Sequence, residues 1–179
     1  MSTFLVAQLI GCIAISISVT IFQVNKRPLM LRLGMMAACF YAVHFFLLGA
    51  YTGSAMNLVG AGRSYVFFKV RPDRRHVWVL GVFIAIAAAA TFVTWQGSLS
   101  LLPLAASTLG GIALWHKKPR AIRHWALLMP PLWFVYNYIS GSYPGMIIEV
   151  VMLASNLAGQ YRFDARHKKT MRHRLAKVA

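Results

Sequence analysis

Two matching stretches decide the fold of this chain. Residues 43–53 read VHFFLLGAYTG and residues 135–145 read VYNYISGSYPG, so Val, Gly, Tyr and Gly recur at an offset of 92 (141 − 49 = 92). A fixed offset between the two halves of a chain indicates an internal duplication. In membrane proteins, such repeats commonly face each other across a site near the middle of the bilayer.

The composition places the chain in a lipid bilayer. Of its 179 residues, 59% are hydrophobic and only 12% are charged. About 20 apolar residues cross the hydrocarbon layer as a helix, and lipid offers no partner for a free backbone N–H or C=O group. The sequence therefore predicts one all-α integral membrane domain with seven transmembrane helices: residues 3–22, 29–49, 54–70, 76–93, 98–115, 121–139 and 143–161.

The basic residues predict the orientation of these spans. The formal net charge is +16, and Lys and Arg gather after the first, third, fifth and seventh spans. The connections around Ala50, Gln96 and Ser142 carry neither residue type. Because Lys and Arg are enriched on the cytoplasmic side of a membrane, we expect the N-terminus outside and the C-terminus in the cytoplasm.

A basic tail, residues 162–179, follows the last span. We expect it to lie against anionic lipid headgroups. Nucleic acid is not an expected partner, because no domain that could read bases accompanies the tail. Cys12 and Cys39 fall inside spans, where a thiol is usually a small apolar side chain, and they give neither a disulfide framework nor a metal site.

The offset also predicts the domain organisation. It pairs the first span with the fifth, the second with the sixth and the third with the seventh. The first three-helix repeat then covers residues 3–70, a linker helix covers residues 76–93, and the second repeat covers residues 98–161. Both triplets start outside, so the repeats are parallel, in a 3+1+3 arrangement. One chain is then enough to enclose a cavity, and we expect a functional monomer.

This arrangement resembles the SWEET, SemiSWEET and PQ-loop superfamily of sugar and solute carriers. The residues VHFFLLGAY (43–51) and GSYPGMIIEVVML (141–153) look like the YgjV family of bacterial inner-membrane proteins, over nearly the whole chain. The resemblance implies a multi-pass protein of the bacterial inner (plasma) membrane. Through the SWEET-like comparison it implies transport by alternating access between the two repeats.

The same resemblance implies a solute site. In SWEET carriers an aromatic pair on helices 2 and 6 and an asparagine pair on helices 3 and 7 hold the solute. Here the offset pairs Tyr41 with Trp133, and Asn57 with Glu149. Glu in place of one Asn, and the absence of a Pro-Gln dipeptide, argue against a neutral sugar. Trp133 lies well inside its span, either stacking on a solute or packing in the core.

Glu149 is a lone carboxylate in an apolar span. A charge at that depth costs on the order of 3 kcal/mol, so it should face a cavity or a partner. A carboxyl group that gains and loses a proton as a cavity opens to either side is the minimal device for proton coupling, and Glu149 is our candidate. The alternative is a protonated Glu149 that hydrogen-bonds across helices and only holds the bundle together.

Other polar residues lie near this predicted site. His44 and Tyr136 are repeat partners and Asn137 follows Tyr136, so the three would complete a polar outer half of the cavity. An isolated histidine is otherwise a structural hydrogen-bonding residue. Arg63 either extends to the inner headgroups or serves as the counter-ion of Glu149 or the anchor of an anionic solute.

Three prolines are hinge candidates, Pro130 and Pro131 in the sixth span and Pro103 in the fifth, because proline removes a backbone hydrogen bond and kinks a helix. We find no activated nucleophile and no phosphate-cradling loop, so we expect no enzyme, and we expect no metal or other cofactor. We expect a carrier of a small polar or anionic metabolite. The alternative is a receptor or a structural, partner-binding protein on the same scaffold.

Overall fold

The computed structural model describes residues 3–70, 73–139 and 143–165, and most of the basic tail lies outside them. In the described part every regular element is helical, as predicted. The elements are α1 (Thr3–Gln23), α2 (Arg27–Leu47), α3 (Tyr51–Lys69), α4 (Val77–Val93), α5 (Leu101–Trp115), α6 (Pro119–Ala126), α7 (Met129–Ile139) and α8 (Tyr143–Gly159). Short turns precede α4 and α5, and a π-helical turn (Gln160–Ala165) follows α8.

The helices agree with the predicted spans to within a few residues at each end. Among the described residues, three helical segments are long and apolar enough to cross a membrane on their own: Thr3–Gln23, Arg27–Leu47 and Ser98–Trp115. Helix α4 is apolar but shorter. Helix α3 is less apolar because it carries Asn57 and Arg63, which face the interior of the bundle. The count of seven crossings therefore stays a prediction.

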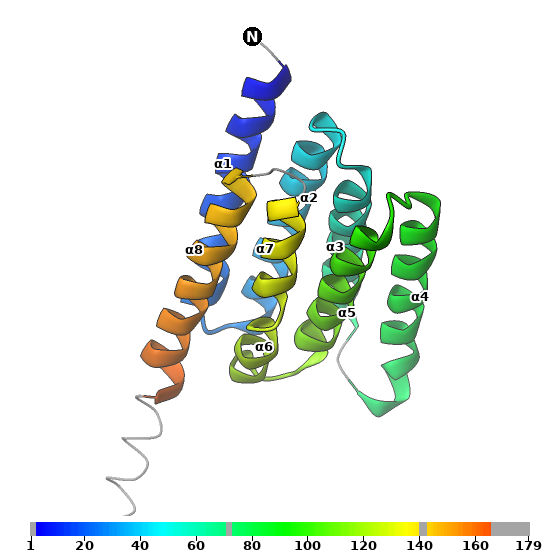
Figure 1. Ribbon diagram of the computed structural model, residues 1–179. Coiled ribbons are helices and arrows are strands. Elements are labelled where there is room, and N and C mark those ends of the chain that lie inside the picture. The colour runs from blue at the N-terminus through cyan, green and yellow to red at the C-terminus, as the bar shows by residue number, and fades with distance from the viewer. Residues whose placement is uncertain (1–2, 71–72, 140–142, 166–179) are drawn as a thin grey trace, which may run out of the picture.

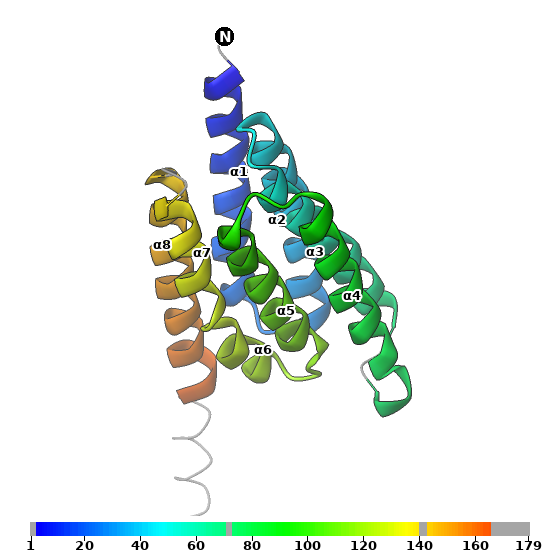
Figure 2. The same cartoon turned by 45° about the vertical axis from the view of Figure 1, so that its right-hand side comes forward.

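Six helical segments close into a ring. Helix α2 packs between α1 and α3, and α7 packs between α5 and α8. The ring closes where α1 contacts α8 and where α3 contacts α5. Helix α4 packs outside it, against α3 and α5, as Figures 1 and 2 show. The ring order is thus α1, α2, α3, α5, α7 and α8, with the short α6 between α5 and α7.

The basic connections share one end of the bundle. In Figure 1 the α1–α2, α3–α4 and α5–α6 connections lie at the bottom, together with the end of α8. These connections carry Lys26, Arg75, Lys117 and Lys118, all exposed. We call this end the basic end. The α2–α3 and α4–α5 connections lie at the opposite end, which we call the neutral end.

Small residues let the helices approach closely while large apolar side chains face outward. The buried face of α1 repeats every three or four residues: Ala7, Gly11, Ala14, Ser18 and Phe22. Such faces allow the close packing that holds helices together in lipid. On α4, by contrast, Phe92 and Val93 are each 82% exposed, as expected of a lipid-facing surface.

An arginine at the start of α2 ties three helices together at the basic end. The guanidinium of Arg27 donates to the carbonyl oxygens of His116 (2.9 Å), Leu114 (2.9 Å) and Phe67 (3.2 Å). These carbonyls lie at the C-terminal ends of α5 and α3, where the last carbonyls of a helix lack intrahelical partners. A cation there also meets the negative end of each helix dipole.

A second arginine, on α6, also joins helices at the basic end. Arg123 is completely buried, and its guanidinium donates to Asn25 Oδ1 (3.2 Å) and to the Val24 carbonyl (3.4 Å) just after α1. It also lies 5.3 Å from the ring centroid of Phe163, just after α8. Its own carbonyl accepts a hydrogen bond from Asn156 Nδ2 at 2.9 Å. The basic end is therefore cross-linked around the ring.

The predicted sixth span, residues 121–139, is interrupted. Helix α6 ends just before a two-residue turn, and α7 starts immediately ahead of Pro130 and Pro131. Neither proline has an N–H to continue the helical hydrogen-bond pattern. The turn instead closes with bonds three residues back, from the Leu127 and Leu128 amides (3.3 and 3.2 Å). The break therefore lies at the two prolines proposed as hinges.

Pro103 behaves differently. It lies in the first turn of α5, where an N–H group would have no intrahelical acceptor in any case. Helix α5 accordingly runs without interruption from Leu101 to Trp115. Of the three hinge candidates, only Pro130 and Pro131 coincide with a break in a helix.

The packing of α1 on α2 predicts an effect at Gly11. A Cβ atom there would lie 2.9 Å from Nδ1 of His44, whose ring is held by its hydrogen bond to the Ala7 carbonyl. Gly11→Ala should therefore destabilise the protein by about 1–3 kcal/mol. A lower unfolding temperature of the detergent-purified protein measures this.

The matched control is Gly81→Ala. An added Cβ on Gly81 meets nothing within 4 Å, and this helical position should gain about 0.5–1 kcal/mol from alanine. Equal unfolding temperatures for the two variants would contradict the tight α1–α2 contact.

Candidate solute-binding site

Two adjoining cavities lie inside the ring of helices. Their volumes are about 150 and 170 Å³, and all six ring helices contribute to their walls. Glu149 lines only the first and Arg63 only the second, so we call them the Glu149 cavity and the Arg63 cavity. Six residues line both: Phe22, Asn57, Ala126, Met129, Trp133 and Met152. The two cavities are therefore parts of one interior space.

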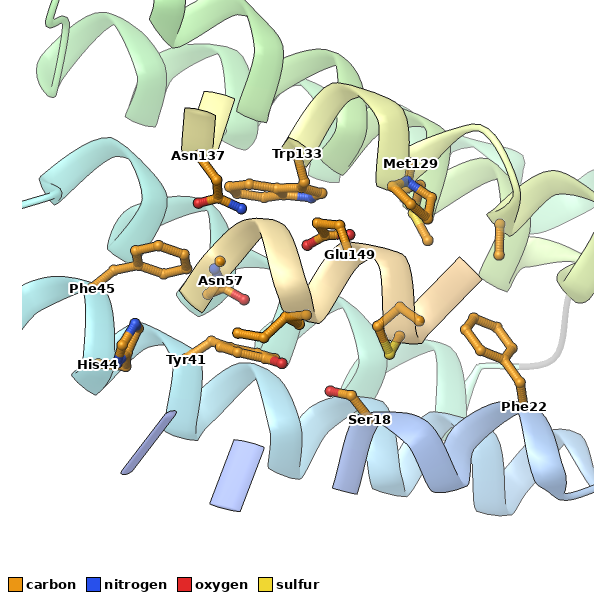
Figure 3. Close-up of a pocket in the computed structure, with 15 residues that line it drawn as sticks. Ser18, Phe22, Tyr41, His44, Phe45, Asn57, Met129, Trp133, Asn137 and Glu149 are labelled. Atoms are coloured by element: carbon orange, nitrogen blue, oxygen red, sulfur yellow. The ribbon is translucent and has the colours of Figure 1, made fainter. Parts of the chain in front are cut away.

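The Glu149 cavity brings together most of the predicted site. Its wall includes six of the seven residues predicted to bind solute: Tyr41, His44, Asn57, Trp133, Asn137 and Glu149. They come from α2, α3, α7 and α8, which are far apart in the sequence (Figure 3). The seventh, Tyr136, is not in the wall. Its buried ring packs edge-on against Trp133, with 5.7 Å between the ring centroids.

Glu149 lies about two turns into α8 and points into the cavity, below the ring of Trp133 in Figure 3. Within the described part of the chain, its carboxyl group makes no hydrogen bond or ion pair. The interhelical hydrogen bond that would make Glu149 a purely structural residue is thus not formed with any described residue.

Two further polar groups on this cavity are buried. Oδ1 of Asn137 has no hydrogen-bond partner, whereas the hydroxyl of Tyr41 forms no hydrogen bond of standard geometry but interacts with the Ser18 side chain. Asn137 lies directly over Gly145 of α8, where an added Cβ would approach its Cγ to 2.5 Å. Because buried polar groups nearly always have a partner, Oδ1 of Asn137 is available to a solute or ordered water.

His44 has both a structural bond and a place in the cavity wall. Its Nδ1 lies 2.8 Å from the Ala7 carbonyl oxygen. That oxygen can only accept, so Nδ1 carries the hydrogen, and in the neutral ring Nε2 is an acceptor. The ring meets Phe45 edge-on, with 5.2 Å between centroids. His44 is therefore a structural hydrogen-bonding residue that also lines the cavity, and its contact with a solute stays a prediction.

Aromatic rings form much of the remaining wall. Trp133 stacks on Phe45 with 6.1 Å between centroids and 17° between planes. The Tyr41 ring lies 6.3 Å from that of Phe45. Asn57 donates from Nδ2 to the Gly53 carbonyl of its own helix (2.9 Å) and lies on both cavities. The sequence analysis predicted Tyr41 and Trp133 in this wall, but not Phe45, whose ring contacts both.

Arg63 does not extend to the headgroups. Its side chain is only 9% exposed, and Nη1 donates to the carbonyl oxygen and to Oγ of Ser107 (3.3 Å to Oγ) in the middle of α5. The prediction that it reaches the membrane surface is wrong for this structure, because an acceptor on the neighbouring helix holds the guanidinium inside. No ion pair joins it to Glu149 or to another described residue. The counter-ion role stays a prediction.

Glycines make room for the guanidinium of Arg63. Added Cβ atoms on Gly110 and Gly111 would lie 3.1 Å from Nη2 and 3.4 Å from Nη1, and one on Gly60 would lie 3.8 Å from Nη2. The small residues Ser107, Gly110 and Gly111 of α5 therefore form the seat of this arginine, a pairing between helices that the sequence analysis did not predict.

The fold and these cavities define a helical membrane protein whose largely apolar interior holds a few polar and charged side chains. The chain belongs to the Imp-YgjV family, whose model, described as bacterial inner membrane protein, matches residues 5–167. It is 28% identical over 170 residues to the inner membrane protein YgjV of Escherichia coli (strain K12), covering 94% of this chain and 90% of that protein. The predicted family and inner-membrane location are confirmed. No solved structure matches the chain.

The unpaired carboxyl group predicts a gain of stability when it is removed. Glu149→Met replaces a partly buried acid, which has no partner among the described residues, by an apolar side chain of similar size. We expect the free energy of unfolding to rise by about 1–3 kcal/mol, because functional polar groups in an apolar interior lower stability. Thermal unfolding in detergent measures this.

Ser155→Ala on the same helix is the control. Ser155 Oγ donates to the Val19 carbonyl at 2.7 Å, so its loss should cost about 1 kcal/mol. A similar loss for Glu149→Met would support the structural role for Glu149.

Proposed function

We propose that the bundle consists of two parallel three-helix repeats, α1–α3 and α5–α8, joined by α4, with the basic end in the cytoplasm. The order of the ring supports the repeats. Helix α2 lies between its repeat neighbours α1 and α3, and α7 lies between α5 and α8. The contact of α1 with α8 has its counterpart in that of α5 with α3.

Individual contacts at the offset of 92 support the same symmetry. On the first repeat, an added Cβ on Gly53 would lie 3.3 Å from the ring of Phe45. On the second, the equivalent glycine, Gly145, lies under Asn137, the equivalent of Phe45. A large side chain on the middle helix thus rests on a glycine of the third helix in both halves.

The links between the repeats support it as well. Arg63 on α3 hydrogen-bonds to Ser107 on α5. The residue 92 positions later is Ser155 on α8, which hydrogen-bonds to Val19 on α1. Equivalent positions therefore connect each third helix to the first helix of the other repeat.

We infer that this protein carries a small polar or anionic solute across the inner membrane by alternating access between the repeats. The interior cavity, lined by both repeats and holding an unpaired carboxyl group, carries this inference. A water molecule occupies roughly 30 Å³ of liquid, so cavities of about 150 and 170 Å³ fit a metabolite of a few heavy atoms each.

The break between α6 and α7 supplies a place for movement. Pro130 lines the Glu149 cavity and Met129 lines both cavities, so bending at this break changes the shape of the interior.

Glu149 is the proposed proton carrier, since its carboxyl group faces the solute space. We keep the proposals that the protein is a monomer without catalytic activity or cofactor, and that its basic end meets anionic lipid rather than nucleic acid.

Flux measurements test the carrier proposal. Purified protein in liposomes should take up a labelled pool of small metabolites when a proton gradient is applied inward. Glu149→Gln should reduce gradient-driven uptake at least tenfold, about 1.4 kcal/mol, because an amide cannot release a proton.

Asp73→Asn, an exposed acid near the basic end, should leave uptake unchanged. Flux that ignores both the gradient and Glu149→Gln would exclude proton coupling by this residue. Ligand binding without any flux would favour the receptor alternative.

Topology is tested separately by cysteine labelling in a Cys12→Ser, Cys39→Ser background. Lys26→Cys and Lys118→Cys at the basic end should react with an impermeant maleimide only from the cytoplasmic side. Gln96→Cys at the neutral end should react from outside intact spheroplasts. All three positions are exposed. Labelling of all three from one side would contradict the proposed crossing pattern.

A further inference from the structure

We propose that the two cavities together bind a small zwitterion, with its carboxylate on Arg63 and its ammonium group on Glu149. The inference names the solute class of the proposed carrier and rests on that proposal for the use of these cavities as the transport site. It follows from two groups of opposite charge, the buried Arg63 and the partly buried Glu149, which line adjoining cavities of one interior space without forming an ion pair.

The first half of the argument is the uncompensated cation. Arg63 is buried, and its hydrogen bonds to described residues run from Nη1 to the neutral Ser107. Its Nε is buried and has no partner. No acidic side chain appears among the described residues that line its cavity. A buried charge of this kind requires a counter-charge.

The free edge of Arg63 suits a carboxylate. Nε and Nη2 lie on one side of the planar guanidinium, a fork that matches two carboxylate oxygens. Nη2 lies against Gly60 and Gly110, whose missing side chains leave room for the guanidinium. Because Nε is buried and the Met129 sulfur lies near the same position of Gly110, a solute carboxylate reaches this edge when Met129 moves aside.

The second half is the acid in the neighbouring cavity. Glu149 is without a hydrogen bond or ion pair to the described residues. Asn137 adds an unpaired Oδ1, an acceptor for an N–H donor. The rings of Tyr41, Phe45 and Trp133 line the same cavity, and aromatic faces attract cations. Carboxylate, carbonyl and aromatic faces together form the environment that an ammonium group needs.

In the proposed symmetry the two charged groups lie at similar depths along the bundle axis. Arginine side chains on a helix lean toward its N-terminus, and Nη2 of Arg63 accordingly lies beside Gly60. Gly60 follows Asn57 by three residues, or ~4.5 Å along the axis. Asn57 is the repeat partner of Glu149 and lies on both cavities. In the proposed symmetry, the two charges are thus offset by about one helical turn along the bundle axis, before any sideways separation.

Met129 lies where the two cavities meet. It lines both, and its Sδ and Nη2 of Arg63 would lie 2.9 and 3.1 Å from a Cβ added to Gly110. A methionine side chain is flexible, so it can move aside when a solute joins the cavities. A single anion or cation would leave the opposite charge unpaired, whereas a zwitterion compensates both.

The test compares molecules that share a carbon skeleton. Binding to the detergent-purified full chain is measured by calorimetry and thermal unfolding for glycine, β-alanine, 4-aminobutyrate and 5-aminopentanoate, which vary the charge spacing. Propionate and propylamine carry the single charges. At least one zwitterion should bind at least tenfold tighter than either singly charged compound.

The charge partners are then removed one at a time. Arg63→Gln and Glu149→Gln should each weaken zwitterion binding at least tenfold, and Glu149→Gln should abolish the preference for the zwitterion over propionate. Arg32→Gln, on the exposed Arg32 that lies over Phe68, is the matched control and should leave binding unchanged. Arg63→Lys and Glu149→Asp keep the charges and should retain tighter binding of a zwitterion than of propionate, so loss of this preference in both would contradict the proposal even where a neutral variant fails to fold.

The outcomes separate this inference from the carrier proposal. Propionate bound as tightly as every zwitterion, or no binding of any zwitterion, overturns the zwitterion site. Zwitterion binding lost in both charge variants, but without flux in liposomes, supports the site and contradicts only the carrier. Proton-driven flux of propionate without uptake of the amino acids supports a carrier and overturns the zwitterion.

Discussion

The constraint on which this structure depends is that a charge inside a membrane protein must be compensated in a medium that supplies little water. The chain has only three acidic residues, and Glu149 is the one that lies on a ring helix. Arg63 therefore has no internal acid available except Glu149, and the two line different cavities. Ser107 accepts hydrogen bonds from Nη1 of the Arg63 guanidinium. Nε of Arg63 has no partner, and the Glu149 carboxyl group also faces the interior space.

The proposed duplication would explain why the acid and the base lie on opposite halves. Position 57 and its counterpart 149 are Asn and Glu, while position 63 and its counterpart 155 are Arg and Ser. The neutral members form structural hydrogen bonds: Asn57 bonds within its own helix, and Ser155 links α8 to α1. The charged members face the cavities. In the proposed repeat structure, divergence at two equivalent pairs converts a symmetric interior into a polarised one.

Much of this fold follows from local rules that the sequence displays. Hydrophobic length gave the helix positions, and the offset brought Tyr41, Asn57, Trp133 and Glu149 to one cavity because equivalent residues lie at equivalent depths. The inward orientation of the Arg63 side chain could not be predicted, because it depends on Ser107 and two glycines of another helix. The burial of Arg123 could not be predicted for a different reason. It lies close to several other basic residues, and the sequence does not indicate which of these side chains turns inward.

The basic end shows what a change of access would require. Arg27 on α2 binds the ends of α5 and α3, while Arg123 on α6 binds the end of α1 and lies on Phe163 beyond α8. In the proposed symmetry these are equivalent tasks, each joining one repeat to the other across the ring. In the proposed carrier, opening toward the cytoplasm would have to break these hydrogen bonds between the repeats. The proline break between α6 and α7 lies beside Arg123, so bending there shifts the arginine and the wall of the Glu149 cavity together. Closure of the basic end and the shape of the solute space are thus coupled through one short segment.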